Sequence, residues 1–144
     1  MILLSLLMAN FSDGSLAPLP ESVGGYVPGD LVFNGHYADS ETLAACGVLW
    51  STYESQRDCM RVASCESGSD HAAVNDNGDG HADLGRWQHN TRYVSDRLDG
   101  VGLPDGDPLD LWTNALMTRW YYDRLGGTFG TTAGWHCASI VGAS

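Results

Sequence analysis

The sequence holds one carboxylate in a setting that suits catalysis: Glu66, within Cys65-Glu66-Ser67-Gly68. Glu66 follows a helix-like run, residues 53–64, and precedes a polar, glycine-rich loop, residues 75–80, so its side chain is expected to lean into a cleft. Burial against apolar side chains disfavours the charged form of a carboxyl group and raises its pKa. A carboxyl group that keeps its proton near neutral pH can act as a general acid. The structural alternative is that Glu66 only caps a turn or pairs with Arg86.

A helix is expected to deliver Glu66 to this position. Ser51-Thr52-Tyr53-Glu54 has the form of a capping box, in which the Ser and Glu side chains satisfy free amides at a helix start. The helix is predicted to run from there to about Glu66. Before it, residues 40–46 are expected to form a short helix that ends at Gly47.

Downstream of Glu66 the pattern changes from loop to helix. Residues 70–85 have no helical or alternating period, which predicts a loop or a short hairpin. Residues 91–98 are expected to form a short polar helix. Asp107-Pro108 offers an N-cap followed by proline at the first helical position, and Gly126-Gly127 ends the helix near Leu125. One apolar stripe of this helix is predicted to hold Trp112, Leu116 and Trp120.

Composition narrows the class of protein. A chain of 144 residues suits one domain, and 43% hydrophobic with 17% charged residues describes a folded chain. The excess of 18 acidic over 7 basic residues argues against nucleic acid or an anionic membrane as a partner. Four cysteines favour two disulfides and an oxidising compartment, with free buried thiols as the alternative. Their spacing to histidine does not fit a zinc site.

The N-terminal part differs from the rest of the chain. Residues 1–39 are rich in proline and glycine, which predicts an irregular leader with a short strand at residues 26–33, before a domain at residues 40–144. Residues 1–9 are apolar but lack a basic start and are too short to span a membrane. They suit a weak export signal, or an apolar arm that packs on the domain or on a virion or wall-protein partner.

A series of motifs from Cys59 to Cys137 resembles the lysozyme-like superfamily, specifically bacterial soluble lytic transglycosylases and resuscitation-promoting-factor-type wall hydrolases. The motifs are Cys65-Glu66-Ser67-Gly68, Ala73-Val74-Asn75, Gly85-Arg86-Trp87-Gln88, Asp107-Pro108, Asn114-Ala115, Gly126-Gly127, Trp135 and Cys137. The chain departs from the family at Arg86-Trp87, where Leu-Phe or Leu-Met is usual, so a cation enters this element. The resemblance implies an α-rich (α+β) lysozyme-like fold, with helices around a sugar-binding cleft.

The resemblance also implies an activity. Glu66 would be the acid that cleaves peptidoglycan glycan strands between N-acetylmuramic acid and N-acetylglucosamine, without a metal or other cofactor. Ser67 would orient it, and the substrate-binding residues would be Ser67, Trp87, Gln88, Asn114 and Tyr121. The family's disulfide implies the pair Cys65–Cys137, which leaves Cys46 to pair with Cys59.

The number of carboxylates decides the mechanism. Hydrolysis needs a second carboxylate, for which Asp79 and Asp83 are the loop candidates. Without one, the N-acetyl group of the substrate can stabilise the cation, and the product is a 1,6-anhydro sugar, as in transglycosylases. Chitin is a weaker alternative substrate. A catalytically inactive wall-binding or structural virion protein is the alternative function, and the location would be extracellular, in the wall, or on a phage particle.

Several residues near Glu66 have structural alternatives. Gln88 is equally well explained as an amide that ties down the glycine turn. The tryptophans are more typical of core than of sugar platforms, and the histidines of solvated loops. These residues are Trp87, Trp112, Trp120 and Trp135, and His71, His81 and His89.

Residues 75–86 partly follow a calcium-loop pattern, with oxygen-bearing side chains at positions 1, 3, 5 and 9 and glycine at position 6. Position 12, however, is Arg86, where a bidentate glutamate belongs, and position 1 is Asn75 rather than aspartate. A turn-rich polar loop is therefore favoured over a metal site.

Overall fold

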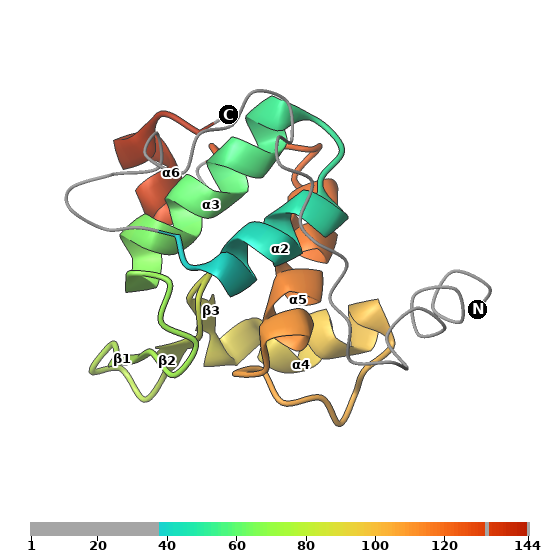
Figure 1. Cartoon of the computed structure of the whole chain (residues 1–144). Helices are drawn as coiled ribbons and strands as arrows, with labels where there is room; N and C mark the ends of the chain where they lie inside the picture. Colours follow the sequence, from blue (N-terminus) through green and yellow to red (C-terminus); the bar gives the residue numbers. More distant parts are fainter. Residues whose placement is uncertain (1–37, 132, 144) are drawn as a thin grey trace.

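A computed structural model describes residues 38–131 and 133–143 of the chain (Figure 1). Helices dominate this part. A small antiparallel sheet lies in sequence between the helix that ends at Ser67 and the helix that begins at Thr91. The elements are α2 (Ser40–Leu49), α3 (Tyr53–Ser67), β1 (Val74–Asp76), β2 (Ala82–Leu84), β3 (His89–Asn90), α4 (Thr91–Val101), α5 (Leu111–Arg124) and α6 (His136–Val141). The expected mixture of helices with a short hairpin is confirmed. The expected leader of residues 1–39, with its strand at residues 26–33 and its apolar arm, lies outside the described residues, apart from residues 38 and 39.

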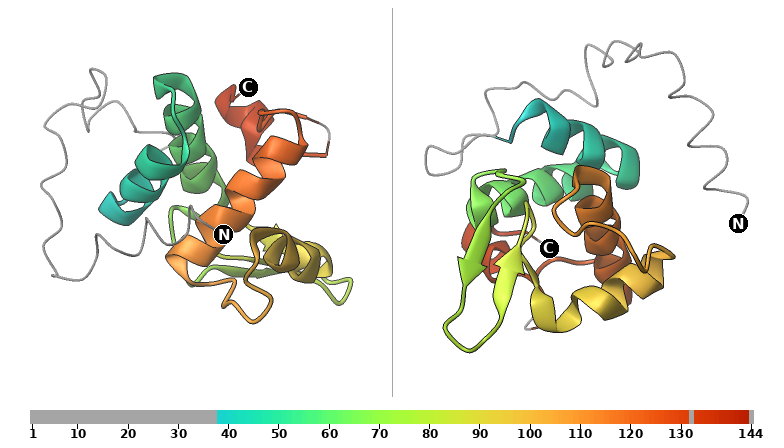
Figure 2. Two further views of the ribbon diagram at one scale, coloured as in Figure 1. Left: turned by 90° about the vertical axis from the view of Figure 1, so that its right-hand side faces the viewer. Right: turned by 90° about the horizontal axis from the view of Figure 1, so that it is seen from below.

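The helices pack around one aromatic core. Helix α3 packs against α2 and α6, and α5 packs against α2 and α4 (Figures 1 and 2). Rings of Trp50 and Phe129 stack with centroids 5.7 Å apart, and Phe129 lies 5.0 Å from Trp135. Trp87 is fully buried beside them, and its indole N–H donates to the Cys59 carbonyl at 3.1 Å. Large aromatic side chains therefore supply much of the buried apolar surface in this small domain.

The sheet is a hairpin with a short third strand. Strand β1 pairs antiparallel with β2 in the register Val74↔Leu84, and β2 pairs with β3 in the register Leu84↔His89. The hairpin projects beyond the helices at the C-terminal end of α3 (Figure 2). Because β3 runs directly into α4, the sheet connects the hairpin to the helix that forms one wall of the site described below.

Three predicted helix boundaries are wrong. Helix α2 continues through Gly47 to Leu49, since nothing at Gly47 requires a left-handed backbone. The N-cap of α3 is Thr52, whose hydroxyl accepts from the Ser55 amide at 3.2 Å, so the predicted capping box at residues 51–54 does not form. The N-cap of α5 is Asp110, which accepts from the Thr113 amide at 2.9 Å. The predicted cap, Asp107, instead closes a turn by accepting from the Leu109 amide.

The predicted apolar stripe of α5 is not the most buried face of the helix, although Trp112 packs against the core. Trp112, Leu116 and Trp120 are only partly buried. The most buried face of the helix carries smaller and more polar side chains, namely Thr113, Asn114, Ala115, Met117 and Thr118. This face lies against the turn and sheet, where its polar groups find hydrogen-bond partners. Hydrophobicity alone therefore misassigned the inner face of α5.

Two disulfides join the helices, as predicted. Cys46–Cys59 links α2 to α3, and Cys65–Cys137 links the C-terminal end of α3 to α6. None of the four cysteines is free, which rules out the alternative of buried thiols. No helix in the described part of the chain is long and apolar enough to cross a membrane.

We predict that the two disulfides contribute unequally to stability. In the chain-entropy model, closing the loop of 72 residues contributes about 4 kcal/mol and closing the loop of 13 residues about 3 kcal/mol. Chemical denaturation should therefore show a larger loss of unfolding free energy for C65S/C137S than for C46S/C59S. A reducing agent should lower the melting temperature of the native chain. Melting that reduction leaves unchanged would contradict this account.

Candidate functional site

Glu66 lies in the last turn of α3, and the start of α6 holds its side chain. Helix α3 ends at Ser67 because Gly68 adopts a left-handed conformation with φ of 66°. The backbone amide of Cys137 donates a hydrogen bond to Glu66 Oε1 at 2.9 Å. The neighbouring residue, Cys65, is bonded covalently to the same Cys137. The carboxyl group thus belongs to α3 and is held by a hydrogen bond from α6, a segment distant in sequence.

The environment of Glu66 raises its pKa above the ordinary value. Burial is the largest cause, because it disfavours the charged form. The hydrogen bond from Cys137 and the nearby His136 act in the opposite direction, and the negative charge of Asp83 adds to the increase. The net effect is a carboxyl group that holds its proton more readily than an exposed glutamate, which is the property expected of a general acid.

Glu66 opens into a pocket of about 250 Å³, here called the acid pocket. Side chains from the hairpin, from α4, from α5 and from the start of α6 form its walls. Besides Glu66, the polar and aromatic residues that line it are Asp83, Gln88, Asn90, Tyr93, Arg97, Tyr121, Trp135 and His136. Of the predicted site residues, the structure therefore brings together Glu66, Asp83, Gln88 and Tyr121.

Only one of the two candidates for a second carboxylate lies in the acid pocket. Asp83 is on β2, and its two oxygens accept from the amides of Asn90 at 2.8 Å and Asn77 at 3.1 Å. These bonds fix its orientation toward the pocket. Asp79 lies in the loop between β1 and β2, does not line the pocket, and pairs instead with Arg92 at 3.5 Å. Of the two candidates, only Asp83 therefore lines the pocket that holds Glu66.

Gln88 combines the two roles that the sequence left open. It has a left-handed backbone with φ of 47°, and its Nε2 donates to the Gly85 carbonyl at 2.7 Å. Its Oε1 accepts from Asn75 Nδ2 on β1. The amide ties the turn to the hairpin and also lines the acid pocket, where it is positioned to meet a ligand.

Trp87 and Asn114, which were expected to bind substrate, are buried in the structure. Their exposed fractions are 0% and 1%, so a sugar cannot reach them. Asn114 instead fixes the turn that carries Gln88, since its side chain accepts from the Trp87 amide at 3.2 Å and donates to the Leu84 carbonyl at 3.2 Å. The prediction of Trp87 as a core residue is confirmed.

The approach of Asn114 explains the glycine at residue 85. Gly85 has φ of 73°, and a Cβ built on it would lie 2.5 Å from Asn114 Nδ2. Any other side chain would strain the backbone and displace the amide. Gly85 therefore lets α5 approach the turn closely enough to hold it.

Ser67 and Arg86 also hold the turn rather than Glu66. The Ser67 hydroxyl donates to the Arg86 carbonyl at 2.9 Å, so the expected contact that orients Glu66 is replaced by a link from α3 to the turn. The buried Arg86 guanidinium pairs with Asp39 at 3.0 Å and Glu41 at 2.5 Å. It is therefore directed toward the start of α2, and the alternative of a Glu66–Arg86 pair is wrong.

A buried polar network stands behind Tyr121. His89, predicted to be a solvated loop residue, is fully buried, and Arg97 donates to its Nδ1. Because an arginine can only donate, the imidazole proton is on Nε2, which contacts the Thr118 hydroxyl at 2.9 Å. The Arg97 guanidinium lies 4.0 Å from the Tyr121 ring centroid, and the Tyr121 hydroxyl donates to the Ala133 carbonyl. The network thus fixes the tyrosine at the pocket wall.

Sequence reasoning missed several pocket residues. Arg97 and Tyr93 lie on a helix that was expected to be merely polar, and no local pattern marks them. His136 sits between Trp135 and Cys137, both of which the family resemblance had singled out, so that position could have been found. Asn90 is the N-cap of α4, where its side chain accepts from the Arg92 amide at 3.0 Å.

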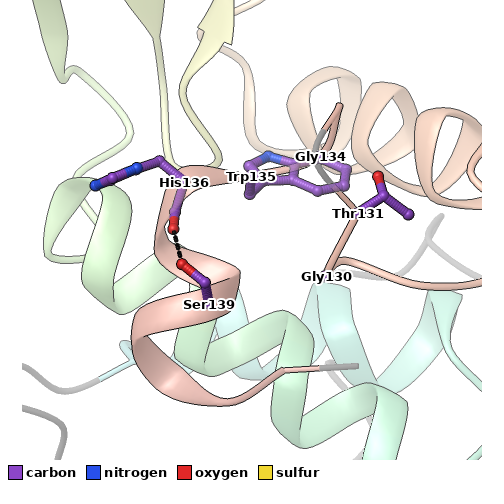
Figure 3. A pocket seen from close by; sticks show the side chains of 6 residues that line it. All are labelled: Gly130, Thr131, Gly134, Trp135, His136 and Ser139. Atoms are coloured by element: carbon purple, nitrogen blue, oxygen red, sulfur yellow. Dashed lines mark hydrogen bonds between the residues drawn. The ribbon is translucent and has the colours of Figure 1, made fainter.

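Two further pockets adjoin the acid pocket. One, of about 400 Å³, lies between Gly130, Thr131 and Gly134 on one side and the start of α6 on the other (Figure 3). It shares Trp135 and His136 with the acid pocket. The other, of about 390 Å³, shares Tyr93, Arg97 and Tyr121. The acid pocket, which Glu66 lines, therefore shares wall residues with two further pockets.

Comparison of the chain with protein-family models, with characterised proteins and with solved structures finds no match in any of the three. Among residues 38–131 and 133–143, no group of three or more His, Cys, Asp or Glu side chains could hold a metal ion. The segment with the partial calcium-loop pattern forms the β1–β2 hairpin, in which Asp76 and Asp79 accept backbone amides of the loop.

We predict that the His89 network makes the fold sensitive to acid. Burial, with a smaller effect from Arg97, lowers the pKa of His89 from 6.5 to about 3. The unfolded chain therefore takes up a proton at a higher pH than the folded chain does, and stability falls as the pH drops from about 6.5 toward 3. In H89Q, glutamine can keep the acceptor and the donor without titrating. Its melting temperature should fall less between pH 7 and pH 4 than that of the native chain, and an equal fall would contradict the prediction.

Proposed function

We propose that this chain is a lysozyme-like glycosidase that cleaves the glycan strands of peptidoglycan, with Glu66 as its general acid. The observation that carries the proposal is the half-buried Glu66 carboxyl, with its raised pKa, in a pocket that shares wall residues with two further pockets. The resemblance of Cys65-Glu66-Ser67-Gly68 and the later motifs to lytic transglycosylases supports the choice of substrate. The geometry supports the choice of acid.

The acid step follows from the position of Glu66. Its proton would pass to the glycosidic oxygen between N-acetylmuramic acid and N-acetylglucosamine, while positive charge develops at the sugar carbon. The bond from the sugar carbon to that oxygen breaks, and Glu66 becomes a carboxylate. The Cys137 amide then donates to the newly charged carboxylate, which favours the ionised form after proton transfer.

Asp83 decides between two outcomes for the developing cation. If Asp83 holds a water molecule on the opposite face of the sugar, the product is a free reducing end. If it does not, the N-acetyl group of the substrate stabilises the cation, and the sugar's 6-hydroxyl attacks while Glu66 accepts the proton. That route gives a 1,6-anhydro product. Gln88 and Tyr121, both in the acid pocket, would position the sugar in either case.

The location and partners belong to the same proposal. Two disulfides are typical of proteins in oxidising compartments, which agrees with a protein that acts outside the cell, in the wall, or on a phage particle. A protein with the same pockets but no catalysis, serving in wall binding or virion structure, is the alternative that the experiment below separates.

We predict that E66Q abolishes cleavage of purified peptidoglycan without unfolding the protein. Glutamine keeps an oxygen to accept from the Cys137 amide but has no proton to give. Loss of general acid catalysis should reduce the release of soluble fragments by at least about a hundredfold. Circular dichroism of the variant should match that of the native chain.

The variant D83N distinguishes hydrolysis from the substrate-assisted route to a 1,6-anhydro product. The released fragments are analysed by mass spectrometry. If Asp83 holds the water, D83N loses activity and the native products carry reducing ends. If the substrate assists, D83N keeps most of its activity and the native products are anhydro-muropeptides. D79N serves as the matched control, since Asp79 lies outside the acid pocket. Binding of walls by folded native protein without any released fragment would contradict the enzyme proposal and favour the binding role.

A further inference from the structure

Arg97 is a buried cation whose direct contacts in the described part of the chain are with neutral groups. Its exposed fraction is 7%, and no carboxylate lies within ion-pair distance of it among residues 38–131 and 133–143. Its direct contacts are neutral: His89 Nδ1 and the rings of Tyr121 and Tyr93, at 4.0 and 5.9 Å. The exposed carboxylate of Asp96 acts on it only from beyond ion-pair distance. Buried charges in proteins are generally paired, because removing an ion from water carries a large desolvation penalty that a partner of opposite charge offsets.

A second cation lies in the same pocket. The pocket that adjoins the acid pocket across Tyr93, Arg97 and Tyr121 lies between α4 and α5, and is here called the α4–α5 pocket. Arg124, at its far side, lies over the ring of Trp120, with its guanidinium carbon 4.6 Å from the ring centroid, and is exposed to solvent. The polar and aromatic residues that line the pocket are Tyr93, Asp96, Arg97, Trp120, Tyr121 and Arg124.

The floor of this pocket depends on a close approach of the two helices. A Cβ built on Gly100 of α4 would lie 2.3 Å from the Trp120 ring of α5, so only glycine allows this ring to lie against α4. Trp120 in turn supports Arg124, and Tyr121 supports Arg97. The two guanidinium groups are therefore held on aromatic rings, which limits the motion they would lose on binding an anion.

The charge of the pocket opposes that of the whole chain. The chain carries a net charge of −11, yet the two arginines of the pocket outnumber its one carboxylate, the exposed Asp96. An anionic ligand that approaches an acidic protein is repelled unless a local positive site receives it. A guanidinium binds a carboxylate with two parallel hydrogen bonds, which makes carboxylates the best match for this site.

We propose that the α4–α5 pocket binds a carboxylate carried by the glycan strand next to the bond that Glu66 cleaves. This inference rests on the proposed function and narrows it: the substrate is an anionic amino-sugar polymer such as peptidoglycan, and neutral chitin is a poor ligand. Two carboxylates of peptidoglycan fit the chemistry. One is the lactyl group of muramic acid in strands stripped of peptide, and the other belongs to the stem peptide of intact strands.

The test measures binding to the inactive variant E66Q by calorimetry. Three ligands of matched length are used: a chito-oligosaccharide, peptide-free peptidoglycan strands, and strands that carry stem peptides. At least one carboxylate-bearing ligand should bind about tenfold more tightly than the chito-oligosaccharide, as a charge-assisted hydrogen bond predicts. Added salt should weaken that preference. The ligand that shows it identifies which carboxylate is bound.

Substitution of Arg124 tests whether the preference for a carboxylate-bearing ligand comes from the α4–α5 pocket. R124Q in the E66Q background should remove most of the preference, and its exposed position makes folding safe. R92Q is the matched control, because Arg92 is an exposed arginine of α4 that lines neither pocket. R97K keeps the buried charge but not the paired hydrogen bonds, so it should also reduce the preference.

The outcomes separate this inference from the proposed function. Equal affinity for all three ligands, or a preference that both R124Q and R97K leave intact, would overturn the carboxylate site. If the chain with native Glu66 cleaves the strands but shows no preference, the carboxylate site alone fails. If the preference is present and no strand is cleaved, the enzyme proposal fails and the site stands.

Discussion

The hydrogen bond from the Cys137 amide to the Glu66 carboxyl joins two positions that are 71 residues apart in the chain. The disulfide between Cys65 and Cys137 holds the same two segments together covalently. This junction holds the end of α3 and the start of α6 together around the half-buried Glu66 carboxyl group. The raised pKa of Glu66, the walls of the acid pocket and its continuation along α6 all depend on this closure.

The other side of the site depends on buried polar side chains of α5. Asn114 holds the turn that carries Gln88, and Thr118 meets His89, which receives a hydrogen bond from Arg97. Each buried group here has a partner, and a polar network of this kind specifies one arrangement of the elements more strongly than apolar contacts do. The cost is a buried cation, Arg97, that forms no ion pair within the described part of the chain.

The sequence predicted the fold well where local signals were strong. The helix before Glu66 and the short hairpin could be anticipated from local patterns, whereas both disulfide pairings were implied by the family resemblance. Helix starts were less predictable, since Asp107 and Asp110 are equally good caps and only packing chooses between them. The inner face of α5 was misassigned because its burial is set by hydrogen bonding to the turn, which hydrophobic periodicity does not report.

The site was predictable only in part, for a related reason. Glu66, Asp83, Gln88 and Tyr121 meet in one pocket as expected. Tryptophan is a residue type that often contacts sugars, but the side chain of Trp87 is buried in the core. Arg97 sits on an ordinary polar helix, and its importance comes from what surrounds it in three dimensions. Burial and the absence of a partner are properties of the fold, so no spacing in the sequence encodes them visibly.

The account rests on Glu66 keeping its proton more readily than other glutamates, and this can be measured directly. The chain has only four glutamates, so carboxyl ¹³C labelling gives few resonances to follow in an NMR titration, and the one that E66Q removes is Glu66. We expect that resonance to titrate at a higher pH than the ordinary value of 4.5, and above the resonances of exposed glutamates. A Glu66 that titrates at or below them would contradict its assignment as the half-buried general acid.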